Sequence, residues 1–342
     1  MSLDVLAPVE PRRRRKRYRY RLRRLAPLWA AVLVAFLAGA WAGAHRSPRS
    51  ARTAAAGELS APASSPGPVR NAAPRRAARP APPLRLLQGP PLLAHRLHAR
   101  LAAKAAILVD ADSGRVLFAL HPHQRRPIAS TTKIMTALLA LRSLGWRQVI
   151  TVDRAVTRVP LVREGLHAGE RVPAWKLFYA MLLYSGNDDA LQLAIASAGS
   201  KQAFLARMNE EARRLGMRDT HYTTPSGVVD EGNYSTAWDL AALTRYALRN
   251  PTFRTIVRTK RIRVPWAAPI SSKIYVNNNA LLRMYPGANG VKTGYTHKAG
   301  WCLVSSATRR GRTLIAVVLD SGDMYNDARK LLDLGFRSLS LS

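Results

Sequence analysis

Cysteine is almost absent from this chain of 342 residues, which excludes several kinds of covalent cross-link and metal site. The single cysteine, Cys302, excludes a disulfide within the chain and any metal site made of several cysteines. Cys302 lies in an apolar run at 301–304, so we expect its side chain to be buried. No His-Glu-x-x-His motif is present, and the pair His121 and His123 has no third ligand at metal spacing. We therefore expect neither a metal site nor a cofactor.

Acidic residues are also scarce. The chain has 20 Asp and Glu against 54 Lys and Arg, a formal net charge of +34, and basic residues exceed acidic ones in both 1–104 and 105–342. A basic protein is suited to anionic surroundings, either nucleic acid or an acidic polymer of the cell envelope. The sequence contains no recognisable nucleic-acid-binding module and no basic stripe interleaved with aromatic residues, so we expect no nucleic-acid partner.

Long uncharged runs are missing as well, with one exception near the N-terminus. Ten basic residues between positions 12 and 24 precede twenty uncharged residues at 25–44. Twenty apolar residues match the roughly 30 Å core of a bilayer. A basic tail at 1–24 should stay in the cytoplasm, so residues 25–44 are predicted to be a single-pass anchor in the cytoplasmic membrane with the rest of the chain outside. A cleaved signal peptide is the alternative, because residues 40–44 resemble a small-x-small cleavage site, and the protein would then be secreted.

The remaining chain divides into a linker and one folded domain. Residues 45–100 are rich in Pro, Ala and Arg and too poor in large apolar residues to form a core, so we expect a disordered linker. Residues 101–340 form the predicted domain. Apolar periodicity and turn residues predict strands at 105–110, 116–120, 260–264, 290–295, 301–308 and 313–319, and helices at 130–145, 173–183, 188–198, 201–215, 236–248 and 327–339. Strands at both ends around a helical middle predict an α/β fold, with a sheet lobe closed by the first and last segments and an inserted helical lobe.

Three short motifs occur once each in this domain. Ser130-x-x-Lys133 opens a predicted helix, Ser185-Gly186-Asn187 lies between two helices, and Lys292-Thr293-Gly294 lies on a strand. A serine and a lysine three residues apart on one helix face can exchange a proton, and the helix N-terminus favours a developing alkoxide. Each motif alone has an ordinary explanation, such as an N-cap serine beside a solvated lysine. All three in this order, each in its expected structural setting, indicate an acyl-serine enzyme.

The sequence around these motifs resembles the D-alanyl-D-alanine carboxypeptidases, the low-molecular-mass penicillin-binding proteins of the serine peptidases. The resemblance covers about residues 101–337 and is carried by the strings IASTTKIMTALL, LLYSGNDDAL, TTPSGV, YSTAWDLA, VKTGYTHKAGWCLV and ARKLLDLGF. It implies a fold like that of the serine β-lactamases and transpeptidases, with an antiparallel sheet lobe, an inserted helical lobe and the active site between them. It also implies removal of the terminal D-alanine from peptidoglycan stem peptides and covalent inhibition by β-lactams.

The chemistry assigns roles to two groups of residues. The expected catalytic residues are Ser130, Lys133, Ser185 and Asn187, and the expected substrate-binding residues are Lys292, Thr293, Gly294 and Tyr295. Ser130 becomes a nucleophile only when Lys133 takes its proton, which requires burial and the cation Lys292 to lower the Lys133 pKa from about 10.4. Ser185 can relay a proton to the leaving amine, and Asn187 can bond the substrate amide and hold Lys133.

The third motif supplies groups for the substrate. Lys292 and the Thr293 hydroxyl suit a free carboxylate, and Gly294 lets the substrate backbone lie close as an added strand. The oxyanion is expected to meet the backbone N–H of Ser130 and, by resemblance, that of Tyr295.

Other activities on the same fold stay open at this point. A D,D-endopeptidase would cut cross-links, a β-lactamase would clear its adduct by means of a glutamate, and a non-catalytic module would only bind the cell wall. Glu231 is the one serious candidate for such a glutamate, because Glu210 and Glu211 are expected on the polar face of a helix. Asp188 and Asp189 are expected to cap and charge the helix after the second motif.

Overall fold

The computed structural model describes residues 86–87, 101–228, 232–266 and 270–339. All of them belong to one of the two compact units of the chain, Pro74–Ser342. The predicted basic tail 1–24 and anchor 25–44, and nearly all of the predicted linker 45–100, lie outside the described residues. Among those that are described, no helix combines the length and the apolar character that crossing a membrane requires.

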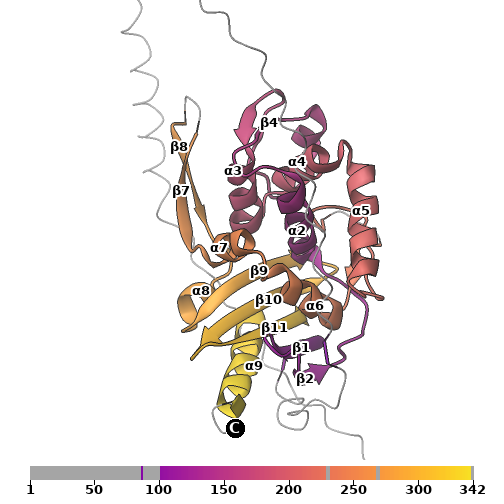
Figure 1. The fold of residues 1–342 in the computed structure, drawn as a ribbon, viewed down its shortest axis with the longest axis vertical. Helices are drawn as coiled ribbons and strands as arrows, with labels where there is room; N and C mark the ends of the chain where they lie inside the picture. The colour runs from indigo at the N-terminus through magenta and orange to yellow at the C-terminus, as the bar shows by residue number, and fades with distance from the viewer. Residues whose placement is uncertain (1–85, 88–100, 229–231, 267–269, 340–342) are drawn as a thin grey trace, which may run out of the picture. The chain divides into compact units, whose positions relative to one another are not determined.

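A five-stranded antiparallel sheet forms the base of the domain, in the strand order β2-β1-β11-β10-β9 (Figure 1). Its strands are β1 (Ala105–Asp110), β2 (Val116–Leu120), β9 (Ala288–Thr296), β10 (Gly300–Arg309) and β11 (Arg312–Ser321). β1 pairs with β11, from Ala105 opposite Leu319 to Asp110 opposite Leu314. The prediction that the first and last segments close the sheet is therefore confirmed, and β9 is left at one edge.

Both faces of this sheet are apolar and covered, because successive residues of a strand point to opposite sides. On β1, Ile107 and Val109 pack into the core that includes α2 (Lys133–Ser143) and α6 (Ala237–Ala247). Ala106 and Leu108 belong to a second core under α9 (Met324–Leu339), which lies on the opposite side of the sheet (Figure 1). The fold is the expected α/β arrangement of a sheet lobe with an inserted helical lobe.

The chain between β2 and β9 supplies that helical lobe and several short strand pairs. Its helices are α2, α3 (Ala174–Tyr179), α4 (Asn187–Ala198), α5 (Lys201–Arg214), α6, α7 (Pro251–Arg258) and α8 (Leu281–Met284). Its strand pairs are β3 (Arg126–Pro127) with β6 (Tyr234–Ser235), β4 (Val149–Thr151) with β5 (Arg171–Pro173), and β7 (Arg261–Pro265) with β8 (Ser272–Val276).

Side-chain caps fix several of these helix starts. Ser200 accepts a hydrogen bond from Ala203 N at 3.1 Å to begin α5, and Thr236 accepts one from Asp239 N at 3.0 Å to begin α6. Asn250 accepts one from the third residue of α7, with Pro251 in the first turn. α7 was not predicted, although Phe253, Ile256 and Val257 are buried at helical spacing, because Asn-Pro was interpreted as the end of the helix before it.

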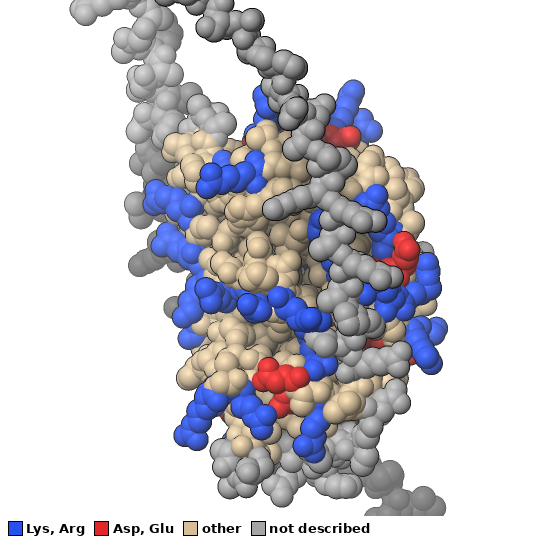
Figure 2. Space-filling view, in the orientation of Figure 1, with Lys and Arg blue, Asp and Glu red and all other residues tan. Residues whose placement is uncertain are grey.

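The excess of positive charge is visible on the face shown in Figure 2, where Lys and Arg side chains lie at many places and Asp and Glu at only a few. The lone cysteine is not part of this surface, since Cys302 on β10 is fully buried, as expected.

Candidate active site

The first motif lies on a short turn that precedes its helix. Ala129–Thr132 forms a 3₁₀ turn, and α2 begins only at Lys133. Ala129 has a φ of 45°, a conformation that is uncommon for a residue with a side chain and is often found beside functional groups. Ser130 does not cap the helix, contrary to the ordinary explanation of this motif: its Oγ accepts a hydrogen bond from Lys133 Nζ at 2.9 Å.

Lys133 is held by three oxygens from different parts of the chain. Its Nζ lies 2.9 Å from Ser130 Oγ, 2.7 Å from Asn187 Oδ1 and 3.0 Å from the Ser226 carbonyl oxygen. The side chain is fully buried. These contacts fix the amine against the serine hydroxyl, and they join the first two motifs directly.

Electrostatics favour the neutral form of this amine. Burial lowers the pKa of Lys133 well below its ordinary range, and the second buried lysine, Lys292, lowers it further. Asp189 and Asp188 act in the opposite direction, because negative charge near the amine favours its protonated form. Burial is the largest of these effects, so the pKa of Lys133 is lowered overall and its amine is suited to act as a base.

The second motif follows an irregular helix end. The chain passes from α3 into a π-helical turn, Ala180–Tyr184, and then into Ser185, which has a left-handed φ of 77°. The Ser185 N–H donates to the carbonyl five residues earlier, that of Ala180, at 3.0 Å. This π-type bond adds one residue to the usual helical turn and thereby changes the orientation of the residues that follow. α4 begins at Asn187, whose Nδ2 donates to the Pro160 carbonyl at 3.2 Å while its Oδ1 receives Lys133.

The third motif lies on the edge strand β9. Lys292 is 1% exposed, its Nζ donates to the Thr293 carbonyl at 2.9 Å, and burial lowers the pKa of Lys292 to about 7. A Cβ on Gly294 would lie 3.0 Å from both Ser130 N and the Ile128 carbonyl oxygen, so the strand passes close against the serine turn. A side chain at 294 would therefore force the serine turn to shift by a few tenths of an ångström.

The other predicted residues lie around this centre without direct bonds to it. Tyr295 is 44% exposed, packs against Trp301 with the rings tilted by 33° and their centroids 4.2 Å apart, and has its hydroxyl 3.4 Å from His297 Nδ1. Ser185 is 8% exposed, and within the described part of the chain no hydrogen bond joins its hydroxyl to Ser130 or Lys133. The structure thus joins Ser130, Lys133 and Asn187 by hydrogen bonds, and brings Gly294 to the serine turn by packing.

A fourth segment, Thr224–Gly227, also contributes to this site, although no role was predicted for it from the sequence. Besides the Ser226 carbonyl, this segment offers the Pro225 carbonyl, which accepts from Thr136 Oγ1 at 2.6 Å. Gly227 has a φ of 75°, and a Cβ there would overlap the Ala129 carbonyl oxygen. The string TTPSGV carried the resemblance, but a backbone carbonyl leaves no mark of its role in a sequence.

The acidic residues after the second motif lie in the first turn of α4, as expected, but only one of them accepts backbone hydrogen bonds. Asp188 Oδ1 accepts the N–H of Asp189 at 3.1 Å within this turn. Its carboxylate also accepts backbone N–H bonds from Glu164, Gly165 and Leu166 at 2.8–3.2 Å, so Asp188 binds a distant loop as well. Asp189 is fully buried, and within the described part of the chain its carboxyl oxygens cap no backbone N–H.

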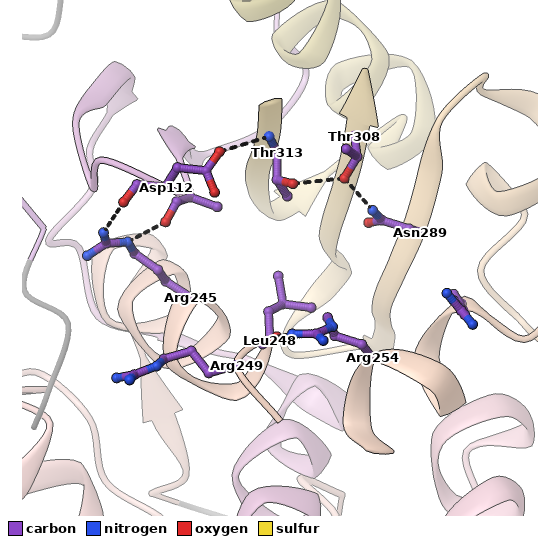
Figure 3. A pocket seen from close by; sticks show the side chains of 10 residues that line it. Asp112, Arg245, Leu248, Arg249, Arg254, Asn289, Thr308 and Thr313 are labelled. Carbon is purple, nitrogen blue, oxygen red and sulfur yellow. Dashed lines mark hydrogen bonds between the residues drawn. The ribbon is translucent and has the colours of Figure 1, made fainter. Parts of the chain in front are cut away.

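A large cavity elsewhere in the domain is separate from this site. It has a volume of about 490 Å³ and is lined by Arg245, Arg249, Arg254 and Arg258 with six further residues, none of which is a predicted site residue (Figure 3). Arg245 donates to the carbonyls of Ala111 and Asp112 at 2.6 and 2.7 Å, so its guanidinium group binds the β1–β2 turn.

Comparisons with known proteins agree on one family. Residues 93–323 match the sequence profile described as D-alanyl-D-alanine carboxypeptidase. The chain is similar to enzymes of that name from Bacillus subtilis, at 32% identity over 249 residues, and from Mycobacterium tuberculosis, at 38% over 242 residues. Each match covers 68% of this chain. The matched region is 62% of the Bacillus protein and 82% of the Mycobacterium protein. The chain therefore spans less than two thirds of the Bacillus protein.

A solved structure is similar over the same region. The crystal structure of a Streptomyces DD-transpeptidase superposes with a TM-score of 0.66 at 33% sequence identity. The superposition covers 69% of this chain and 98% of the Streptomyces chain.

Proposed function

This chain belongs to the D-alanyl-D-alanine carboxypeptidase family of serine peptidases, and we propose that it removes the terminal D-alanine from peptidoglycan stem peptides through an acyl-Ser130 intermediate. The observation that carries the proposal is the buried contact of Lys133 Nζ with Ser130 Oγ at 2.9 Å. The lowered pKa of Lys133 supports it, because only a neutral amine can take the hydroxyl proton.

Acylation begins with the transfer of the Ser130 hydroxyl proton to Lys133 as Oγ bonds to the carbonyl carbon between the two D-alanines. The backbone N–H groups of Ser130 and Tyr295 bind the oxyanion. Ser185 relays the proton from Lys133 to the leaving amine, the C–N bond breaks, D-alanine departs, and Lys133 is neutral again. Water then attacks the ester with Lys133 again as the base, which releases the shortened peptide and restores the Ser130 hydroxyl.

The substrate is bound along β9. Lys292, when protonated, and the Thr293 hydroxyl bind the terminal carboxylate, and Asn187 bonds the substrate amide. The peptide lies beside the sheet as an added strand, which is supported by the edge position of β9 in the strand order. A β-lactam has both a reactive carbonyl and a carboxylate, so it forms the same kind of ester with Ser130.

Replacement of the nucleophile tests this proposal. Ser130→Ala should abolish both release of D-alanine from a pentapeptide and formation of a penicilloyl adduct, each measured by mass spectrometry. Ser143→Ala is the matched control, because Ser143 lies at the other end of α2 and donates only to the Leu139 carbonyl. A covalent penicilloyl adduct on Ser130→Ala would contradict the assignment.

The same assay separates related activities. Cleavage of cross-linked muropeptides would favour a D,D-endopeptidase, and transfer of the acyl group to an added amine would match the name of the Streptomyces DD-transpeptidase. A non-catalytic binding module would give no product at all.

A β-lactamase requires a base for hydrolysis of the adduct. Glu211 is bound by Arg142 and Arg214 at 2.7–2.8 Å, whereas Glu231 lies outside the described residues. We expect the penicillin adduct to persist for many minutes on intact-mass analysis. Rapid turnover that is lost in Glu231→Gln would instead make the enzyme a β-lactamase.

We also propose a location for the protein, at the cytoplasmic membrane. Ten basic residues at 12–24 followed by twenty uncharged residues at 25–44 support a cytoplasmic-membrane anchor with the catalytic domain outside. The full-length protein should then fractionate with membranes and resist extraction by salt or alkali. Mature protein that begins between 43 and 45 in the soluble envelope fraction would favour secretion after signal cleavage.

A further inference from the structure

The cavity lined by four arginines lies between two helices and one end of the sheet. Arg245 belongs to α6, Arg249 follows that helix, and Arg254 and Arg258 lie one turn apart on the same face of α7. Strands β9, β10 and β11 supply part of the opposite wall (Figure 3). The cavity volume of about 490 Å³ falls within the roughly 300–1,000 Å³ that is typical of pockets for small molecules.

Three of these arginines carry a positive charge that the protein does not neutralise. A guanidinium group stays protonated at physiological pH. Within the described ranges, no ion pair joins a carboxylate to Arg249, Arg254 or Arg258. Arg254 donates to the Leu248 carbonyl at 2.8 Å, which leaves its charge in place. Arg245 differs, because its guanidinium group binds the β1–β2 turn. The cavity is therefore suited to a ligand with more than one negative charge.

Helix stability does not explain this arrangement. The helix dipole favours a cation in the last turn of α7, which is where Arg258 lies. Arg254 lies in the first half of the same helix, where the dipole gives no such advantage. Like charges four residues apart on a helix also repel each other. An anion bound between Arg254 and Arg258 would remove that repulsion.

The wall formed by the strands offers neutral hydrogen-bonding groups. Asn289 Nδ2 donates to Thr308 Oγ1 at 2.7 Å, and the hydroxyl oxygens of Thr308 and Thr313 lie 2.8 Å apart (Figure 3). Two hydroxyl groups have two protons, and the hydrogen bond between them uses one. The other proton has no acceptor in the part of the chain that the structure describes, so it can be donated to a ligand. Among the lining residues that the structure describes, Asp112 is the one acid, and its Oδ2 accepts the Thr313 N–H at 3.3 Å.

A phosphate group matches the chemistry of both walls. A phosphate monoester has three acceptor oxygens and a charge of about −1.5 to −2 at neutral pH. Guanidinium groups bind phosphate through two parallel N–H bonds, and a threonine hydroxyl can donate to another phosphate oxygen. A carboxylate brings a single charge and would leave most of the positive charge of the cavity uncompensated.

We propose that this cavity is a binding site for phosphorylated ligands, in which Arg249, Arg254 and Arg258 bind the phosphate oxygens and a hydroxyl of Thr308 or Thr313 donates to the same ligand. The site contains no residue of the three motifs. It is therefore independent of the proposed function, and its failure would leave that function unaffected.

Isothermal titration calorimetry of inorganic pyrophosphate into the full-length protein tests the site. The titration is made at about 0.15 M salt, where a screening length of about 8 Å weakens binding to scattered surface charges. Wild type should bind pyrophosphate. The double variant Arg254→Gln with Arg258→Gln should bind it with an affinity lower by at least about tenfold, because charge-assisted hydrogen bonds are lost. Arg245 is left unchanged, since it binds the β1–β2 turn.

Arg147→Gln with Arg207→Gln is the matched control. Both arginines are exposed and lie outside the cavity, and Arg207 donates to the Ser197 carbonyl at 2.8 Å, as Arg254 does to that of Leu248. This control loses the same two charges and should bind pyrophosphate like wild type. Absence of binding to wild type, or an equal loss of affinity in both double variants, overturns the proposal.

Thermal unfolding shows whether each variant is folded. If Arg254→Gln with Arg258→Gln does not fold, Arg249→Gln replaces it, because within the described residues the Arg249 side chain makes no hydrogen bond or ion pair that its loss would break. Arg249→Gln should weaken pyrophosphate binding, and an unchanged affinity in this folded variant overturns the proposal as well.

A competition experiment identifies the source of the phosphate. Glycerophosphoglycerol, the soluble headgroup of an anionic phospholipid, is added to the complex of wild type with pyrophosphate. Displacement of pyrophosphate supports a site for lipid headgroups, and retention of pyrophosphate supports a site for soluble phosphorylated compounds.

Discussion

Gly227→Ala should damage the enzyme through the turn that carries its nucleophile. Gly227 has a φ of 75°, and a methyl group there would overlap the Ala129 carbonyl oxygen and lie 2.5 Å from Thr132 Oγ1. The left-handed backbone costs about 1–2 kcal/mol for alanine, and overpacking adds about 1–3 kcal/mol. The sum of about 2–5 kcal/mol corresponds to a fall in Tm of roughly 10 °C for a domain of this size. A displacement of the serine turn by about 1 Å should also slow acylation by about 100-fold.

Gly199→Ala is the matched control for this experiment. Gly199 has a φ of 81° but nothing within 4 Å of the position of a Cβ, so the substitution adds the backbone cost without the overlap. Its Tm should fall by less than half as much, and its acylation rate should stay close to that of wild type. Thermal unfolding and labelling by a fluorescent penicillin measure both quantities. Equal effects of the two variants on acylation would refute the view that Gly227 supports the nucleophile turn.

Two further predictions concern the lysines. Lys133→Arg should reduce acylation nearly as much as Lys133→Ala, by about 10²–10⁴-fold, because a guanidinium stays charged and cannot accept the Ser130 proton; substantial penicillin labelling of the arginine variant would show that Lys133 acts only as a fixed charge. The second-order rate constant of acylation should fall as pH rises through about 7, where Lys292 loses the proton whose charge binds the carboxylate. Lys292→Arg should lower the maximum but remove this fall, and a fall that persists in Lys292→Arg would assign the titration to another group.

Much of the local structure was readable from the sequence, because short-range patterns determine it. The hairpin strands 105–110 and 116–120 were predicted with the bounds observed for β1 and β2, since continuous apolar runs flank an Asp-Ser-Gly turn. The start of α6 was predicted from Ser235 or Thr236 as the N-cap, and the structure has Thr236 in that place. The three motifs could be located for the same reason, since each is defined by neighbours in the chain. α7 was missed although its apolar residues recur at helical spacing, because Asn250-Pro251 was interpreted only as the end of the preceding helix.

The tertiary structure decided which of these groups meet and in which protonation state. The contact of Lys133 with Asn187 was predicted from the motifs, but no local pattern indicated its contact with the Ser226 carbonyl. Asp188 and Asp189 follow the second motif like ordinary helix-start residues, yet Asp188 also binds the loop of Glu164, and burial raises the pKa of Asp189 well above its ordinary range. The sequence by itself determined the residue types and their local elements. Long-range packing determined the desolvation and the neighbouring charges, and these are what change the pKa of a side chain and hence its chemistry.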